Sequence, residues 1–272
     1  MNKKHCVVCM KEFYPRDKNQ TKHANCLANE RLKVFVIPDT QVKPGVNTDH
    51  LEWIGKYIEY KRPDVIVHLG DHFDMPSLSS YDIGKRQFEG RRLRADISAG
   101  IAGLERLVTP FARVAGYAPR MEFLMGNHEN RLTRAIDSDA KLEGTISLDD
   151  LRVADYGFSV HEFLEVINVG GVDFSHYFTS GVMGRPVSSA AVLLRERARS
   201  AIQGHVQRFD MAVHPKTGQA AIFAGIAYSH YEEYLGPQGN GCRQQIVVLH
   251  ELREGLFDPM FVSLDYLKRR YN

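Results

Sequence analysis

The stretch Val65-Ile66-Val67-His68-Leu69-Gly70-Asp71-His72-Phe73-Asp74 decides the fold expected for this chain. Its β-branched, apolar beginning is typical of a buried strand, and its end changes abruptly to glycine, carboxylates and imidazole. The same change recurs where apolar runs meet polar residues near Asp39, Asn127, His176 and His205. Because sheets of α/β proteins place their sites in loops at the carboxyl ends of strands, the sequence predicts an α/β fold with one site built from these loops.

Helices are expected between the strands. The spacing of apolar residues predicts helices over about 48–60, 91–114 and 187–199. Glycine and proline divide the later chain into short strands at 211–214, 220–223 and 245–249, which predict a meander forming a second sheet. The glycines of the polar loops are expected to allow sharp turns at positions 70, 126 and 204. Residues 137–160 and 226–243 are expected to be mostly loops.

The composition is that of an ordinary globular protein. Of 272 residues, 25% are charged and 43% hydrophobic, which excludes disordered, collagen-like and coiled-coil chains. No apolar run approaches the ~18–20 residues of a membrane span. Four cysteines are too few for a disulfide scaffold. We therefore expect a cytoplasmic protein with no membrane association.

The first residues differ from the rest in charge and in cysteine content. Residues 1–34 hold eight Lys/Arg and three Asp/Glu, a net charge of +5, which leaves −3 for the remainder of a chain whose total is +2. Three of the four cysteines form, with one histidine, the pattern Cys-x2-Cys-x13-His-x2-Cys: Cys6, Cys9, His23 and Cys26. Such pairs are typical of a closed tetrahedral zinc site. We expect a small structural zinc module over 1–31, similar to a zinc ribbon, before a larger domain over 32–272.

The role of this basic head has more than one interpretation. Its excess of Lys/Arg suits the phosphate backbone of nucleic acid. It is equally suited to docking another protein or to dimerisation, and without zinc it would be a disordered tail with scattered cysteines. The sequence leaves the oligomeric state open.

Five motifs appear in a fixed order along the chain: Asp39-x-Gln41, Gly70-Asp71-x-x-Asp74, Gly126-Asn127-His128-Glu129, His176 and Gly204-His205-x-Gln207. This order resembles the calcineurin-like metallophosphoesterase superfamily. The segments at 76–82 and 176–178 resemble a subgroup often found in bacteriophage genomes, which would place the protein in a bacterial host cytoplasm. The resemblance implies a four-layer α-β-β-α sandwich with a site for two divalent metal ions.

The same resemblance implies a role for each motif residue. The metal ligands it implies are Asp39 for the first ion, Asp71 as the bridge, and Asn127, His176 and His205 for the second ion. His128 would be the general acid that protonates the leaving oxygen, with Asp74 holding its imidazole. The two ions would activate a shared water as the attacking hydroxide. A ligand set of oxygen and nitrogen without cysteine favours Mn²⁺, with Mg²⁺, Fe or Zn²⁺ as alternatives.

Gln41 and Gln207 depart from the family pattern, because both positions carry histidine there. Three interpretations remain. Both glutamines ligate the first ion through oxygen, a harder and weaker ligand than imidazole. Alternatively, they lie behind the ligands while water completes a weak first site. In the third interpretation the first site is empty and the protein is poorly active.

The substrate is less closely indicated than the chemistry. Met75-Pro76 stands where the protein Ser/Thr phosphatases carry Arg-Gly after the motif aspartate, which weighs against a protein phosphatase. Arg131, Arg185 and the basic run at 85–94 are the candidates to bind phosphate instead. We expect a phosphodiesterase or nuclease acting on nucleic acid. The alternatives are a phosphomonoesterase acting on a small molecule or nucleotide, and a non-catalytic nucleic-acid-binding relative with a degenerate first metal site.

Overall fold

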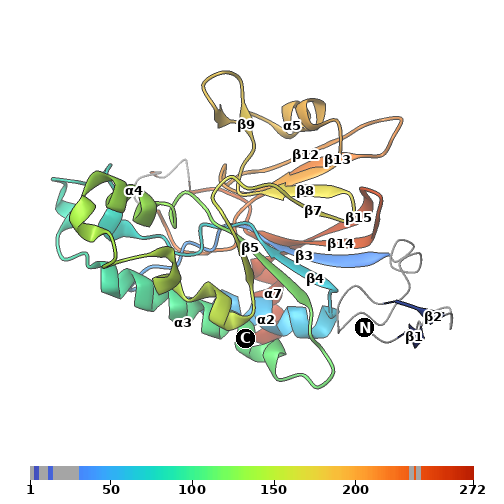
Figure 1. The fold of residues 1–272 in the computed structure, drawn as a ribbon, viewed down its shortest axis with the longest axis horizontal. Helices are drawn as coiled ribbons and strands as arrows, with labels where there is room; N and C mark the ends of the chain where they lie inside the picture. The colour runs from blue at the N-terminus through green and yellow to red at the C-terminus, as the bar shows by residue number, and fades with distance from the viewer. Residues whose placement is uncertain (1–2, 6–11, 15–30, 233–235, 237–239) are drawn as a thin grey trace.

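The computed structural model describes residues 3–5, 12–14, 31–232, 236 and 240–272, which form a mixed α/β fold with two large sheets (Figure 1). In the head it describes a two-residue antiparallel pair, β1 (Lys4–His5) with β2 (Glu12–Phe13). The four expected zinc ligands, Cys6, Cys9, His23 and Cys26, lie outside the described residues, so the zinc module stays a prediction.

The first large sheet has six strands in the order β15-β14-β3-β4-β5-β6. Strands β3 to β6 are parallel, whereas β14 and β15 are antiparallel to their neighbours. The strands are β3 (Leu32–Ile37), β4 (Val65–His68), β5 (Arg120–Leu124), β6 (Ser159–His161), β14 (Gln245–Arg253) and β15 (Leu256–Ser263). The strands expected before the first three polar loops are thereby confirmed.

The second sheet has five strands in the order β12-β13-β11-β8-β7, with β8, β11 and β13 parallel. Its strands are β7 (Ile167–Val169), β8 (Val172–Ser175), β11 (Ala201–Gln203), β12 (Phe209–Val213) and β13 (Ala220–Ala224). A short hairpin, β9 (Thr179–Ser180) with β10 (Arg185–Pro186), projects from this side of the molecule (Figure 1).

The expectation that 245–249 belongs to the second sheet is wrong, because these residues begin β14 beside β3. The reason is that β14 is buried on both faces. Ile246 and Val248 pack in the cluster beneath the helices, whereas Val247 and Leu249 pack in the cluster between the sheets. A strand that is apolar on both sides fits the interior of a covered sheet rather than the edge of a meander.

The two sheets pack face to face through the apolar residues of β3 and its neighbours. Val34 and Val36 enter the cluster between the sheets, and Phe35 and Ile37 enter the cluster on the opposite face. This alternation follows from the two-residue period of a strand. The continuous apolar run of β3 is therefore explained by burial on both faces.

Helices cover the outer faces of both sheets (Figure 1). On the six-stranded sheet lie α2 (Asp49–Lys61), α3 (Leu93–Ala112) and α7 (Leu264–Tyr271), and on the five-stranded sheet lies α5 (Ala190–Arg197). The three expected helices are confirmed: α2 is shifted by one residue, and α3 and α5 are shorter at both ends than expected. Helix α4 (Arg131–Ser138) was not expected. Among the described residues, no helix has the length and apolar character needed to cross a membrane.

Candidate metal centre and acid–base pair

The site lies where strands of both sheets end. Asp39 follows β3, Asp71 follows β4 and Asn127 follows β5, while His176 and His205 follow β8 and β11 of the other sheet. The first two loops are fastened to each other, since the N–H groups of residues 40 and 41 both donate to the carbonyl of Asp71, at 3.2 and 2.9 Å. The fold thus brings together motif residues that are far apart in the sequence.

The ligands expected for the second ion converge. Ligand atoms of Asp71, His176 and His205 all lie within 4.8 Å of one another. The side-chain oxygen of Asn127 lies 2.9 Å from Nε2 of His176 and 2.7 Å from Nδ1 of His205. A carboxylate, an amide oxygen and two imidazoles that meet in this way form a donor set suited to a divalent transition metal.

The fold also fixes the orientation of the His176 ring. Its Nδ1 donates to the carbonyl of Leu69 at 2.7 Å, which leaves Nε2 facing Asp71 and Asn127. A backbone acceptor on the far nitrogen is the usual way in which proteins orient a ligating histidine. Burial lowers the pKa of His176, but the carboxylates of Asp71 and Asp39 and the hydrogen bond to the Leu69 carbonyl together outweigh burial and raise this pKa to about 9.

The residues expected at the first ion have buried polar atoms without partners. Asp39 accepts the His205 N–H through Oδ1 at 3.0 Å, whereas its buried Oδ2 has no hydrogen-bond partner among the described residues. Both side-chain amide atoms of Gln41 are also buried, and no described residue is a partner for either. Burial and the charge of Asp71 raise the pKa of Asp39 to about 7. Because unpaired buried polar groups and adjacent carboxylates are costly, these residues fit a cation that would satisfy them.

Gln207 is placed differently from Gln41. Its Oε1 accepts a hydrogen bond from the hydroxyl of Tyr228 at 3.2 Å, and its side chain is only partly buried. The two glutamines that replace histidine in the motifs are therefore not equivalent. Gln41 offers an oxygen that no group in the described part of the chain uses, whereas the oxygen of Gln207 already has a protein donor.

The backbone of the site is strained and closely packed. Four expected ligands have left-handed backbone: Gln41 (φ 39°), Asp71 (φ 49°), His205 (φ 61°) and Gln207 (φ 62°). Such conformations cost free energy and are concentrated at functional sites. The expectation about the three loop glycines is correct for Gly70, with φ 93°. For Gly126 and Gly204 the reason is space instead, because an added Cβ would lie 2.1 Å from Asp71 Oδ1 and 2.4 Å from Asp39 Oδ1, respectively.

Glu129 holds two of the loops together, a role that the sequence did not reveal. Its carboxylate is fully buried and accepts four backbone N–H groups at 2.7–3.0 Å, those of Gly126, Asp71, His72 and Phe73. A carboxylate that gathers four amide donors fixes the path of both loops. Its place in the Gly126–Glu129 motif was the only signal in the sequence.

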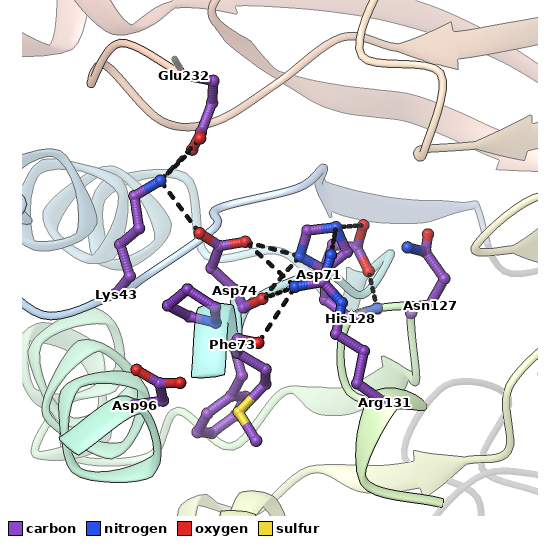
Figure 2. A network of polar contacts seen from close by, with 12 residues as sticks. Lys43, Asp71, Phe73, Asp74, Asp96, Asn127, His128, Arg131 and Glu232 are labelled. Atoms are coloured by element: carbon purple, nitrogen blue, oxygen red, sulfur yellow. Dashed lines mark hydrogen bonds and ion pairs between the residues drawn. The ribbon is translucent and has the colours of Figure 1, made fainter. Parts of the chain in front are cut away.

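His128, the expected general acid, lies in contact with Asp74, the residue expected to hold its imidazole (Figure 2). Nδ1 of His128 lies 2.8 Å from Oδ1 of Asp74 and 2.9 Å from its carbonyl oxygen. Burial lowers the pKa of His128, but the carboxylates of Asp71 and Asp74 more than offset burial and raise it. Burial opposes ionisation of Asp74, yet His128 and Lys43 lower its pKa below the usual range. The imidazole is therefore held with one N–H on Asp74 and with Nε2 on the side of Asp71, 3.7 Å from Oδ2.

Lys43 and Glu232 also reach the site, and sequence reasoning missed both. Figure 2 shows the Lys43 ammonium between the carboxylates of Glu232 and Asp74. Its Nζ lies 2.7 Å from each oxygen of Glu232 and 3.1 Å from Oδ2 of Asp74. Lys43 lies two residues after Gln41, but Glu232 comes from a distant segment that nothing in the motif pattern marked.

The two arginines expected to bind phosphate lie in different places. Arg131 begins α4 beside the site, where Nη1 donates to the Asp74 carbonyl at 2.6 Å and Nη2 lies 3.2 Å from Nε2 of His128. Arg185 lies exposed on the β9–β10 hairpin, and within the described part of the chain no hydrogen bond or ion pair joins it to these residues. In the basic run at 85–94, Lys85 and Arg91 form ion pairs with Asp82. These two side chains are therefore engaged in salt bridges in this structure.

Comparisons with known proteins give no family by sequence. No protein-family model and no curated protein matches the chain. Among solved structures, zinc-complexed wild-type Vps29 from Entamoeba histolytica is 12% identical, with 86% of this chain and 99% of that chain covered, at a TM-score of 0.39. A single mutant of Vps29 from the same organism is 14% identical, with 85% and 98% covered, at 0.40. A conserved protein of Streptococcus pneumoniae, described as a predicted phosphoesterase, is 10% identical over 85% and 98%, at 0.33. Since these TM-scores are below 0.5, the functional assignment depends on the geometry of the site itself.

Proposed function

We propose that this chain is a metal-dependent phosphoesterase of the calcineurin-like metallophosphoesterase superfamily. The observation that carries the proposal is the convergence of Asp71, His176 and His205 within 4.8 Å, next to the paired His128 and Asp74. We propose further that the two sheets and their outer helices form the four-layer α-β-β-α sandwich of that superfamily, in its bacteriophage-type subgroup.

The residues that would hold two divalent ions follow from the donor atoms. Asp71, Asn127, His176 and His205 would hold one ion, whereas Asp39 and Gln41 would hold the other with Asp71 as the bridge. The buried, unpartnered Oδ2 of Asp39 and amide of Gln41 support the second assignment. Divalent ions in such a site polarise phosphate oxygens and acidify water, and Mn²⁺ suits this oxygen and nitrogen donor set.

The chain's own residues would supply the proton and the orientation. As the bond between phosphorus and the leaving oxygen breaks, that oxygen takes the proton from Nε2 of His128. Asp74 accepts the Nδ1–H and so keeps the ring facing the site. The pKa of His128 is raised, which favours the protonated ring that a general acid requires. Arg131, whose guanidinium lies 3.2 Å from Nε2, is placed to contact the phosphate or its leaving group.

Within this activity we propose a phosphodiester substrate, nucleic acid above all. The basic head, with a net charge of +5 over residues 1–34, supports this choice because clustered Lys/Arg neutralise phosphate backbones. Met75-Pro76 in place of Arg-Gly also weighs against a protein phosphatase. We propose that Cys6, Cys9, His23 and Cys26 hold a structural zinc ion that keeps this head folded.

The test compares substrates in one assay. Purified chain with Mn²⁺ is given bis-p-nitrophenyl phosphate, p-nitrophenyl phosphate, and labelled single- and double-stranded DNA. We expect turnover of the diesters, and a loss of about 10²–10⁴-fold in His128→Ala for the DNA substrates. Turnover of the monoester alone would identify a phosphomonoesterase instead. Folded protein that binds DNA but hydrolyses nothing with any divalent ion would contradict the proposal and indicate a non-catalytic relative.

A further inference from the structure

We propose that Lys43, anchored by Glu232, is a positioning residue that orients the Asp74 carboxylate toward His128. The inference rests on the proposed function, because it concerns the residues that hold His128, the proposed general acid, in position. It concerns residues outside the five motifs, which the structure brings together from two distant segments (Figure 2).

The two oxygens of Asp74 have separate partners. Oδ1 lies 2.8 Å from Nδ1 of His128, and Oδ2 lies 3.1 Å from Nζ of Lys43. The Asp74 carboxylate therefore cannot rotate without losing its contact with either His128 or Lys43. The ammonium therefore fixes the carboxylate plane in which the imidazole hydrogen bond forms.

Lys43 is itself held by a buried anion. Glu232 is 2% exposed and contacts Nζ through both oxygens. His230 adds a further contact, with Nε2 2.6 Å from Oε1 of Glu232. His128, Asp74, Lys43 and Glu232 thus form a row in which cationic donors and carboxylates alternate, with three members buried and Lys43 partly buried. Removing one member of such a row leaves an uncompensated charge away from water.

The segment that carries Glu232 is fixed to the site at further points. The Ala227 N–H donates to the Asp39 carbonyl at 2.8 Å, and the Tyr228 hydroxyl donates to Gln207. Asn240 also holds Glu232, since its side chain accepts the Glu232 N–H and donates to the Glu232 carbonyl, both at 2.7 Å. These contacts fix the position of Glu232 independently of Lys43. Glu232 can therefore hold the Lys43 ammonium in place.

The test uses the dependence of the rate on the leaving group. A general acid matters most when the leaving oxygen is strongly basic, so damage to His128 slows esters of phenol and alkyl alcohols more than p-nitrophenyl esters. Lys43→Met keeps the length of the side chain and removes its charge. In Lys43→Met we expect kcat for the phenyl ester to fall about 10²-fold relative to the unaltered chain, and kcat for the p-nitrophenyl ester to fall much less. The KM for both esters and the number of bound Mn²⁺ ions should stay unchanged.

Further variants separate positioning from general damage. Lys43→Met should cost nothing more when it is added to His128→Ala, because the group it positions is absent. Lys43→Arg should restore part of the phenyl-ester rate, and Glu232→Gln should show a weaker form of the same selective loss if Lys43→Met fails to fold. Lys56→Met, at a surface ion pair with Glu52 on α2, is the control and should leave both rates unchanged.

The outcomes distinguish this inference from the proposed function. Equal losses for both esters, an additional loss in the His128→Ala background, or no loss at all would overturn the role of Lys43 while leaving phosphoesterase activity in place. If the unaltered chain hydrolyses no ester, the proposed function is wrong and this inference is wrong with it.

Discussion

At the residue scale, the two glutamines at the candidate metal centre have different surroundings. Gln41 keeps both amide atoms buried and unpartnered, whereas Gln207 accepts the Tyr228 hydroxyl. A buried amide oxygen without a partner is costly, and a cation bound to that oxygen would offset this part of the cost. Under the proposed function, Gln41 would therefore be a direct ligand of the first ion, and Gln207 would support the site from behind it.

Mn²⁺ binding by alanine variants tests this difference. We expect Gln41→Ala to bind one ion per site fewer than the unaltered chain, because the first ion loses a ligand. Gln207→Ala should keep the full number of ions, with affinity lowered by about 10–100-fold at most. Isothermal titration calorimetry measures both quantities. A full complement of ions in Gln41→Ala together with a missing ion in Gln207→Ala would reverse the assignment.

The residues expected in the site could be predicted from the sequence, but the residues that contact and hold them could not. Asp39, Asp71, Asn127, His176 and His205 could be found because each stands where an apolar run ends, and the sequence shows such endings directly. The partners of these residues depend on packing between distant segments. Nothing near Glu232 in the sequence shows that its carboxylate meets Lys43, and the same holds for the Tyr228 hydroxyl and Gln207.

At the scale of elements, the loops after β4 and β5 act as one unit because Glu129 joins them. Its four backbone donors come from both loops.

Helix α2 carries a buried titratable group in its first turn. His50 there is buried, and neither ring nitrogen has a hydrogen-bond partner among the residues that the structure describes.

Replacement of Glu129 should destabilise the protein strongly. In Glu129→Gln one carboxylate oxygen becomes an NH2 group, which faces two backbone donors and leaves them unsatisfied. We expect the free energy of unfolding to fall by at least about 2 kcal/mol, measured by urea denaturation. The matched control, Glu105→Gln on the exposed side of α3, should stay within about 0.5 kcal/mol of the unaltered chain. A similar small effect at Glu129 would show that the loops are held in another way.

His50 should make the protein less stable in acid. Burial, with smaller contributions from His230, His72 and Arg106, lowers the pKa of His50 to about 3. Between its ordinary pKa of about 6.5 and this value, the unfolded chain binds a proton that the folded chain does not. Stability should therefore fall as the pH drops through this window, by up to roughly 1.4 kcal/mol per pH unit from this group.

Chemical denaturation across that pH range gives the measurement. The difference in unfolding free energy between the unaltered chain and His50→Leu should change steadily from pH 6.5 down to pH 3 and stay constant above pH 7. Parallel stability curves over the whole range would show that His50 does not contribute.

The elements themselves were largely predictable because their patterns are local. Helices α2, α3 and α5 lie where apolar spacing placed them. The error at β14 has a physical cause, since its apolar residues on both faces suit either sheet and pairing with β3 depends on contacts about 200 residues apart. Helix α4 was missed because only Leu132 of its eight residues is buried, so it shows little apolar repeat.

At the scale of the whole molecule, the site belongs to neither sheet alone. The six-stranded sheet supplies Asp39, Asp71 and Asn127, and the five-stranded sheet supplies His176 and His205. The apolar cluster between the sheets, with Val36 and Val67 facing Phe174 and Ile202, holds these two sets in register. The basic head precedes this part of the chain. The total charge of +2 is therefore the sum of +5 over residues 1–34 and −3 over the remainder.

Removal of residues 1–30 tests the role proposed for the head. We expect weaker DNA binding and a smaller dependence of the binding constant on salt, because fewer phosphates are neutralised. Hydrolysis of bis-p-nitrophenyl phosphate should be unaffected, which serves as the control for an intact body. Fluorescence anisotropy with labelled DNA at several salt concentrations measures the effect. Unchanged affinity and salt dependence would contradict a nucleic-acid role for the head.

The central claim is that residues of both sheets form a divalent-metal site that hydrolyses phosphate esters. It is tested most directly by adding Mn²⁺ stepwise to metal-depleted full-length chain while the hydrolysis of bis-p-nitrophenyl phosphate and the number of bound ions are followed together. We predict no turnover without metal, turnover that rises as the ions bind, and loss of both in Asp71→Asn. Turnover in the metal-depleted chain, or full binding of Mn²⁺ with no hydrolysis of any phosphate ester, would contradict the account.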